Sequence, residues 1–312
     1  MQDRASKAGG DELFVSVIVP VFNDAERLRI CLEALAGQTY DAASYEVIVV
    51  DNGSDESENI AGVVSNFPLA VYAYEPRPGS YAARNKGLAL AKGPVLAFTD
   101  ADCIPSPTWI ETGTQYLERT PNCGLVAGRI ELFFKREKGN AIELYENLTA
   151  FSQQRWLTEA HGAATANVFT FKSVVEKVGP FNESLFSSGD FEWSERVFLA
   201  GYRQVYAQDA CVAHPARHTL KQLYKRTVRI AGGVFDRCIR AEQSVWRRNW
   251  LFGKLLLAEL TPPVNFAISN FRDSRLQGAA QKLSVSLVLL WVRYVSAFEM
   301  VRLRLGGVPH RG

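Results

Sequence analysis

The chain has 312 residues, of which 47% are hydrophobic and 22% are charged, a composition typical of a folded globular protein rather than a disordered one. Its five cysteines are scattered and form no CxxC pair, so the sequence encodes neither a disulfide framework nor a zinc cluster. The N-terminal sequence MQDRASKAGGDELF has acids and glycines where a signal peptide has an apolar core. We therefore expect a chain that stays in the reducing cytoplasm, with residues 1–12 as a flexible tail.

The formal net charge of +2 conceals an uneven distribution along the chain. Residues 1–216 carry 18 Lys and Arg against 28 Asp and Glu, a balance of −10. Residues 217–312 carry 17 Lys and Arg against 5 Asp and Glu, a balance of +12. This change of sign predicts two regions, an acidic domain over residues 13–216 and a basic, aromatic-rich, mostly helical region over residues 217–312.

Four short apolar runs in the first hundred residues predict buried strands, because each is rich in β-branched or aromatic residues and is bounded by turn formers. The segments between them have helical spacing of apolar residues and open on Asp or Ser. This alternation predicts an α/β fold with a mainly parallel, Rossmann-like sheet and helices on both faces. The predicted strands are 15–22, 46–51, 69–74 and 94–100, and the predicted helices are DAERLRICLEALAGQ, DESENIAGVVSNF and GSYAARNKGLALAKG.

Acidic residues follow two of these strands. Asp51 ends the second strand and Asp100 ends the fourth, with Asp102 two positions further on. Open α/β sheets bind ligands at the carboxyl ends of their strands, and Mg²⁺ is typically held between one or two carboxylates and substrate phosphates. No GxGxxG follows the first strand and no GxxxxGK[ST] occurs in the chain. The sequence therefore predicts a metal-bridged nucleotide that is held without a dinucleotide fingerprint or a P-loop.

Four segments of the sequence resemble glycosyltransferase family 2, whose members have the GT-A fold. They occur in the order and spacing seen in that family, between about residues 14 and 215. The resemblance implies an enzyme that moves a sugar from a nucleoside diphosphate sugar to a hydroxyl acceptor. The segments are VSVIVPVFNDAERLRICLEALAGQTY, EVIVVDNGSDES, GSYAARNKGLALAKGPVLAFTDADCIP and SSGDFEWSERVFLAGY.

The resemblance implies which residues bind the nucleotide base. Pro20, Phe22 and Asn23 are similar to first-strand residues that line the base pocket, and Asp51 is similar to the acid that reads the base. Asn52 stands where other members have a second Asp, which leaves the identity of the base open. A UDP-sugar is the expected donor.

The resemblance also implies how the diphosphate is bound. Arg84 and Asn85 match a family segment near the diphosphate and the sugar. Asp100 and Asp102 match the DxD motif, with Asp102 the more direct metal ligand and Asp100 closer to the ribose and donor sugar. His214 stands where several related enzymes have a third metal ligand, and a structural histidine is the alternative. The expected cofactor is Mn²⁺ or Mg²⁺, which stabilises negative charge on the departing phosphate.

The acceptor hydroxyl must lose a proton during transfer, and a carboxylate within hydrogen-bond reach is suited to accept it. Asp190 is similar to the base of inverting family members and is the candidate, with Glu192 as a secondary, acceptor-side candidate. The alternative is an ordinary amphipathic helix over GDFEWSERVFLAGYR with Asp190 as its N-cap. Asn167, in the predicted strand TANVFTF, resembles a contact to the acceptor or donor sugar, and a buried amide that bonds the backbone is the alternative.

Processive polysaccharide synthases of this family carry a QxxRW motif after the catalytic acid. This chain has QQRW at residues 153–156, with a different spacing and before Asp190. We therefore expect a non-processive enzyme that transfers one sugar per binding event. The resemblance places it in the synthesis of a surface polysaccharide or a glycolipid.

The C-terminal region contains a run of about 16 mostly apolar residues, LSVSLVLLWVRYVSAF, which includes Arg293. A spanning helix needs about 20 apolar residues, and a central Arg disfavours it by roughly 2.5–3.5 kcal/mol, so we do not expect a clean single span. Interleaved Trp and Arg favour a helix at an anionic membrane surface, and a packed helical subdomain or dimer face is the alternative. Membrane contact predicts a peripheral protein on the inner face of the cell membrane, with a glycan or lipid-linked acceptor.

Two other functions are compatible with the motifs. A nucleotidyltransferase of related fold also uses a metal and a nucleotide, but we would expect a Gly-rich, basic loop after its first strand, where this chain has PVFNDAERL. A catalytically inactive transferase that serves as a membrane adaptor is the second alternative, and the intact acidic candidates argue against it. Nucleic-acid binding is not expected, because no recognised fold for it is indicated.

Overall fold

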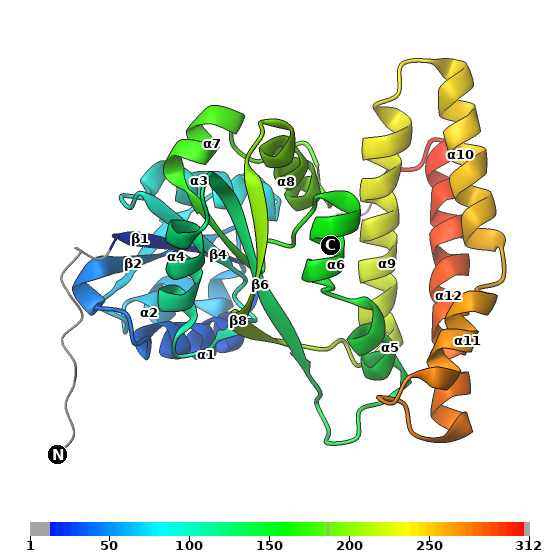
Figure 1. Ribbon diagram of the computed structural model, residues 1–312, viewed down its shortest axis with the longest axis horizontal. Helices are drawn as coiled ribbons and strands as arrows, with labels where there is room; N and C mark the ends of the chain where they lie inside the picture. The colour runs from blue at the N-terminus through cyan, green and yellow to red at the C-terminus, as the bar shows by residue number, and fades with distance from the viewer. Residues whose placement is uncertain (1–12, 186, 309–312) are drawn as a thin grey trace.

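A central sheet organises the protein, whose computed structural model describes residues 13–185 and 187–308 (Figure 1). The sheet has eight strands in the order β3-β2-β1-β4-β7-β6-β8-β5. The expected tail, residues 1–12, lies outside the described residues. The strands are β1 (Val15–Val21), β2 (Tyr45–Asp51), β3 (Ala70–Tyr74), β4 (Val95–Thr99), β5 (Ile104–Pro105), β6 (Cys123–Phe133), β7 (Asn167–Phe171) and β8 (Arg203–Pro215).

The first four strands form the predicted parallel part of the sheet. β1 pairs in parallel with both β2 and β4, and β2 pairs in parallel with β3. The rest of the sheet is mixed, because β7 is antiparallel to β4 and β6, whereas β6 and β8 are parallel. The reversed direction of β7 pairs its first residue, Asn167, with Thr99 at the carboxyl end of β4. The α/β prediction is confirmed, and the mixed half is less parallel than expected.

Helices cover both faces of the sheet, and the alternation of side chains along β1 determines what each face buries. Val15, Val17 and Val19 belong to a core with α1 and α4, whereas Ile18 belongs to a core with α3 and α8. The helices before β8 are α1 (Ala25–Ala36), α2 (Ile60–Val64), α3 (Ser80–Leu90), α4 (Trp109–Arg119), α5 (Ala141–Thr149), α6 (Gln153–Ala160), α7 (Lys172–Val178) and α8 (Gly189–Leu199), with short 3-10 turns at Ala42–Ser44 and Glu56–Glu58.

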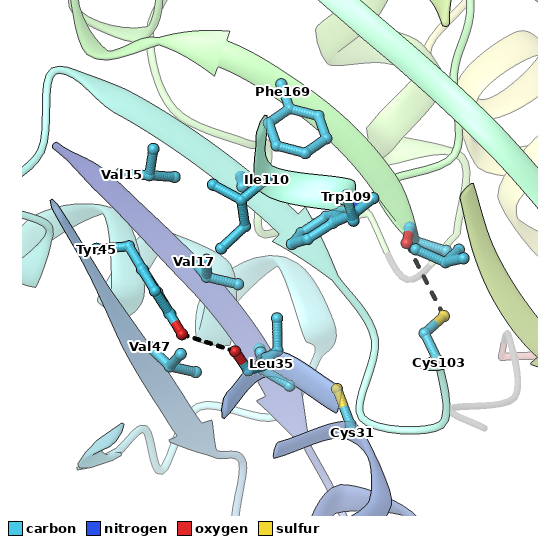
Figure 2. Close-up of a cluster of buried hydrophobic side chains, with 14 of the residues drawn as sticks. Val15, Val17, Cys31, Leu35, Tyr45, Val47, Cys103, Trp109, Ile110 and Phe169 are labelled. Atoms are coloured by element: carbon cyan, nitrogen blue, oxygen red, sulfur yellow. Dashed lines mark hydrogen bonds between the residues drawn. The ribbon is translucent and has the colours of Figure 1, made fainter. Parts of the chain in front are cut away.

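The first of these cores joins α1 and α4 to the sheet (Figure 2). The Tyr45 hydroxyl donates a hydrogen bond of 2.8 Å to the carbonyl oxygen of Leu35, which connects β2 to the end of α1. The rings of Trp109 and Phe169 are fully buried, with centroids 4.7 Å apart. Gly113 lies so close to the Phe169 ring that any Cβ there would overlap it. This packing fixes α4, which follows the loop of the DxD acids.

The C-terminal region forms a layer of long helices beside the sheet domain (Figure 1). α5 joins this layer, because Leu144 and Tyr145 share a small core with Leu223 and Val285. A second small core links the π-helix to the end of α12. The elements of this region are α9 (Leu220–Val234), the π-helix Phe235–Arg240, α10 (Val245–Leu260), α11 (Val264–Arg272) and α12 (Gly278–Arg304).

α12 is longer than the apolar run that the sequence suggested. It has 27 residues, and its most apolar part has a mean hydropathy of 1.5, so by length and composition it could cross a membrane. α10 and α11, which meet at 43°, satisfy the same criteria as one broken span, and core helices of soluble proteins can satisfy them too. Arg293 lies 3.7 Å from Glu259 of α10, so its charge is paired within the helical layer. Contrary to the expectation from sequence, neither length nor Arg293 excludes a span.

Candidate active site

A cleft of about 460 Å³ lies at the carboxyl edge of the parallel strands. The parallel pairing of β1 with β2 and β4 brings the segments that follow these strands to one edge of the sheet. Polar residues lie just beyond each strand end, so the fold gathers them from distant parts of the sequence. The cleft walls include Pro20, Phe22, Asp24, Asn52, Arg84, Asp100, Asp102, Asp190 and His214.

The predicted base pocket lies only partly in this cleft. Pro20 and Phe22 line it, and the Phe22 side chain is exposed. Asp51 is buried and is not among the described residues of the cleft wall. One of its carboxylate oxygens accepts from the N–H of Ser54 at 2.9 Å and the other accepts from the Tyr72 hydroxyl at 3.2 Å. Its role in reading the base stays a prediction.

Asn23 and Asn52 hold the loops around the cleft. Asn23 has a left-handed backbone, accepts from the N–H of Asp55 at 2.7 Å and donates to its carboxylate at 3.1 Å. The Asn52 carbonyl oxygen accepts from the N–H of Gly79 at 2.7 Å, and its amide nitrogen donates to two carbonyl oxygens after β3. An ionised Asp at position 52 could not donate, so the two bonds to carbonyl oxygens need an amide here. Contact of Asn23 with a nucleotide stays a prediction.

The two acids of the DxD motif have different partners. Asp100 forms an ion pair with the buried Arg84 of α3, which compensates its charge. Asp102 has one oxygen 3.5 Å from Nε2 of His214 and the other 3.6 Å from the guanidinium of Arg27. The fold therefore brings the predicted metal-binding pair together, although the two residues are far apart in the sequence.

The Nε2 atom of His214 faces Asp102, and in the neutral ring this nitrogen carries no proton. Its Nδ1 lies 2.8 Å from the carbonyl oxygen of Pro215, which can only accept, so in the neutral ring Nδ1 carries the proton. Ligand atoms of Asp102, Cys103 and His214 lie within 4.8 Å of one another. Cys103 is fully buried, with its thiol 3.9 Å from the carbonyl oxygen of Ala166 (Figure 2). The carboxylate and the imidazole line the cleft, and this pair fits a divalent cation with oxygen and nitrogen ligands.

Asp190 lies in the first turn of α8 and is not its N-cap, which is Ser188. Its Oδ1 accepts from the Tyr81 hydroxyl at 3.1 Å and from the N–H of Phe191 at 3.0 Å. Burial raises the pKa of Asp190, and the positive charge of Arg84 together with these hydrogen bonds opposes the rise. A carboxyl group with a raised pKa that faces a cleft is suited to take up a proton.

Three predicted site residues have their polar groups engaged outside the cleft. Asn167 is fully buried, accepts from the indole N–H of Trp109 at 2.9 Å and donates to two backbone carbonyls. Each polar atom of its side chain thus has a partner within the protein, as expected of the buried amide that was the alternative, and its contact with a sugar stays a prediction. Glu192 pairs with Arg196 on the same helix at 2.8 Å and lines neither the cleft nor the second cavity described below, so its acceptor-side role stays a prediction without support from this geometry. Asn85 donates to and accepts from the backbone of Phe181 in the loop between α7 and α8, and its contact with a diphosphate stays a prediction.

A second cavity, of about 700 Å³, lies between the sheet domain and helices α9, α10 and α12. Tyr81, Asp190 and Arg229 line both this cavity and the cleft. Its arginines were not among the site residues predicted from the sequence. In the sequence, only the basic, aromatic composition of the C-terminal region pointed to them. The packing of α9 brings them to the cavity. They are Arg217, Arg226, Arg229, Arg237 and Arg293.

Two sequence families match this chain. The model of glycosyl transferase family 2 matches residues 16–179, and that of glycosyl transferase family group 2 matches residues 98–303. The chain belongs to glycosyltransferase family 2. The resemblance seen in the sequence is thus confirmed, as is the prediction of a glycosyltransferase enzyme.

Relatives of this family 2 glycosyltransferase include proteins from archaea and bacteria. Glycosyltransferase AglE of Haloferax volcanii is 40% identical over 223 residues, which cover 70% of this chain and 72% of AglE. Pre-mycofactocin glycosyltransferase of Mycobacterium tuberculosis is 30% identical over 236 residues, 72% of this chain and 48% of that protein, so the match spans about half of its length. The structure of mannosyltransferase PcManGT from Pyrobaculum calidifontis has a TM-score of 0.60 at 18% identity and covers 92% of this chain and 87% of its own. This likeness confirms the GT-A fold.

Proposed function

We propose that this family 2 glycosyltransferase is a metal-dependent, inverting and non-processive enzyme that moves a sugar from a nucleoside diphosphate sugar to a hydroxyl acceptor. One observation carries the proposal: Asp102 and His214 line the same cleft as Asp190. A pair that can hold a metal and a carboxyl group that can take a proton therefore face the same space. Sugar transfer needs both.

The donor is proposed to bind on the side of the metal pair. Asp102 and His214 would hold Mn²⁺ or Mg²⁺, and a divalent ion bound there stabilises the negative charge of the departing diphosphate. Arg84 holds Asp100 by its ion pair, which orients that carboxylate at the cleft wall. Mannosyltransferase PcManGT, whose structure contains GDP-Man and Mn²⁺, supports a donor of this class. A UDP-sugar remains the expected donor.

The proposed reaction is a direct displacement at the anomeric carbon. The acceptor oxygen bonds to this carbon, the bond from the carbon to the diphosphate oxygen breaks, and the electron pair leaves with the nucleoside diphosphate. The proton of the acceptor hydroxyl passes to Asp190. In the described structure Tyr81 and Phe191 both bond Oδ1, which leaves Oδ2 for this proton. A single displacement inverts the configuration of the sugar.

The C-terminal region is proposed to contact the inner face of the cell membrane. α10, α11 and α12 expose large apolar side chains, among them Trp246 at 83%, Leu257 at 67% and Phe298 at 68%. Exposed apolar surface of this extent marks an interaction site. Arg247 beside Trp246 is exposed and pairs with Glu242 at 3.3 Å, a contact that an anionic headgroup could replace. The proposed acceptor is accordingly a lipid-linked or membrane-held glycan in surface polysaccharide or glycolipid synthesis.

The proposed domain division follows the change of charge, with a GT-A domain over residues 13–216 and a membrane-associated region over residues 217–312. α5 crosses this division, because Glu146 on α5 binds both Arg217 and Arg226. Of the two alternative functions, membership of this family argues against a nucleotidyltransferase. An inactive adaptor would not bind the donor in a metal-dependent way, which separates it from the proposed enzyme.

A nucleotide panel tests the proposed function. The thermal unfolding of the chain would be followed with UDP, GDP, dTDP or CMP, each with Mn²⁺, Mg²⁺ or EDTA. A ligand at 100 times its dissociation constant adds about 2.7 kcal/mol to stability, so a true donor nucleotide should raise the unfolding temperature measurably. We expect a shift with one nucleoside diphosphate that EDTA removes. A folded protein that responds to none of them would support the adaptor.

A further inference from the structure

The second cavity lies where an acceptor must lie in the proposed reaction. It lies between the sheet domain and the C-terminal helices, and Asp190 and Arg229 line both this cavity and the proposed donor cleft. A molecule in the second cavity therefore meets the donor beside Asp190. The chemistry of the cavity wall then indicates what kind of acceptor fits.

Where the second cavity meets the cleft, the positive side chains outnumber the carboxylates that pair with them. Arg217 and Arg226 share one carboxylate, that of the fully buried Glu146, at 3.1 and 3.5 Å. Arg229, three residues after Arg226 on α9, makes no hydrogen bond or ion pair within the described part of the chain. Burial and the charge of Arg217 lower the pKa of Arg229, although Asp190 opposes the change. Three guanidinium groups thus face two carboxylates, those of Glu146 and Asp190, which leaves one positive charge in surplus at a place that favours a further anion.

The remaining arginines of the cavity do not add to this surplus. Arg293 lies 3.7 Å from Glu259, and Arg237 lies 4.0 Å from Glu195. Between α9 and α12 the wall becomes largely aliphatic, which suits a hydrocarbon chain and leaves polar groups of a free sugar without partners. The aliphatic lining there includes Ile230, Val234, Leu289 and Val292.

We propose that the second cavity binds an acceptor lipid that carries a phosphate group. The phosphate lies at Arg226 and Arg229, and the hydrocarbon chain lies between α9 and α12. Guanidinium groups suit this role, because their N–H donors match phosphate oxygens in geometry and charge. A hydroxyl group of the glycan that this phosphate joins to the lipid then reaches Asp190. This inference rests on the proposed function, whose lipid-linked or membrane-held acceptor it narrows to a lipid that carries a phosphate group.

The diphosphate of the donor does not account for the whole cluster. Arg226 lines the second cavity and is not among the described residues of the donor cleft. A structural role explains Arg226 in part, since it pairs with the buried Glu146. It does not explain Arg229, whose replacement removes no described hydrogen bond or ion pair. Arg229 is therefore the residue to change.

The test measures binding of octyl phosphate, 1-octanol and inorganic phosphate to the full chain by calorimetry, without nucleotide. The variants are Arg229→Gln, Arg229→Lys and the matched control Lys225→Gln, which removes an exposed charge from the same helix. Octyl phosphate should bind the wild type more tightly than either of the other probes. Arg229→Gln should weaken its binding at least about tenfold, since a hydrogen bond to a charged group is lost, and Arg229→Lys should retain part of it. Lys225→Gln should bind as the wild type does.

Several outcomes would overturn the proposal. Equal affinity for inorganic phosphate would show an anion site that takes no lipid, and equal affinity for 1-octanol would show an apolar cavity that takes no phosphate. Unchanged binding in Arg229→Gln would remove the arginine from the site. Equal losses of octyl phosphate and nucleoside diphosphate binding in Arg229→Gln would assign it to the donor. Failure of the proposed function is seen separately, as a wild type that binds no nucleotide.

Discussion

Replacement of Asp190 with Asn is expected to remove most sugar transfer while the fold and the donor site remain. The Asn side chain has nearly the same shape, and its carbonyl oxygen can accept from Tyr81 and Phe191 as Oδ1 does now. It cannot take the proton of the acceptor hydroxyl. General base catalysis contributes about 10²–10⁴-fold to a rate, so the barrier should rise by about 3–5 kcal/mol.

The assay is release of nucleoside diphosphate in the presence of acceptor, with donor affinity measured separately in the presence of Mn²⁺. Glu192→Gln is the matched control, because Glu192 lies in the same helix turn but bonds Arg196 outside the cleft. We expect the control to transfer sugar at the rate of the wild type. A similar rate in Asp190→Asn, with donor affinity intact, would refute the assignment of Asp190 as the base.

The raised pKa of Asp190 also gives this variant a defined effect on stability. Burial makes the folded protein hold the proton of this carboxyl group more tightly than the unfolded chain does. Below the unfolded pKa of about 3.9 the group is protonated in both states, and as pH rises through the folded pKa its ionisation lowers the stability of the wild type. Asp190→Asn should therefore gain thermal stability relative to the wild type as pH rises. The kcat of the wild type should fall as pH falls through the same folded pKa.

Three further changes test the metal pair and the packing that supports it. Asp102→Asn removes a charged oxygen ligand, so nucleoside diphosphate with Mn²⁺ should no longer give an EDTA-sensitive rise in unfolding temperature; a persistent rise would contradict the assignment. Gly113→Ala places a Cβ against the Phe169 ring, and such overpacking costs about 1–3 kcal/mol, measurable by urea unfolding. Trp109→Phe leaves the buried oxygen of Asn167 without its donor, at about 1–3 kcal/mol in the same experiment, whereas nucleotide affinity should not change.

The cleft, which is the proposed donor side, could be predicted because many of its residues lie at the ends of apolar runs. Runs of β-branched residues predict β1, β2 and β4, and turn formers with acids follow them. Parallel pairing then brings Asp100 and the first-strand residues to one edge without further information. The pairing of His214 with Asp102 was suggested only by the family resemblance, because β8 lies far along the chain and its position depends on β6.

The second cavity, which is the proposed acceptor side, could not be predicted from local sequence patterns. Arg226 and Arg229 line a cavity only because α9 packs beside the sheet domain, and a basic segment on an exposed helix has the same local sequence. A strand-end Asn that contacts a sugar also resembles one that is buried, and for Asn167 the difference lies in Trp109, 58 residues away. The N-cap of α8 was assigned to Asp190 in the alternative interpretation, but Ser188 occupies it through a left-handed backbone that few residues adopt readily.

The two sides of the site come from successive stretches of the chain. The cleft is built largely before the end of β8, whereas one side of the second cavity comes from helices that begin at Leu220 and the other side from the sheet domain and α5. Recombination in the short link between β8 and α9 would therefore exchange the helical side of the proposed acceptor cavity as a block and keep the cleft with Asp102 and His214. Glu146 limits such exchange, since an incoming helical region must bring a cation to meet this buried carboxylate. The chain thus has the layout of a module that can acquire new acceptors while Asp190 stays in place.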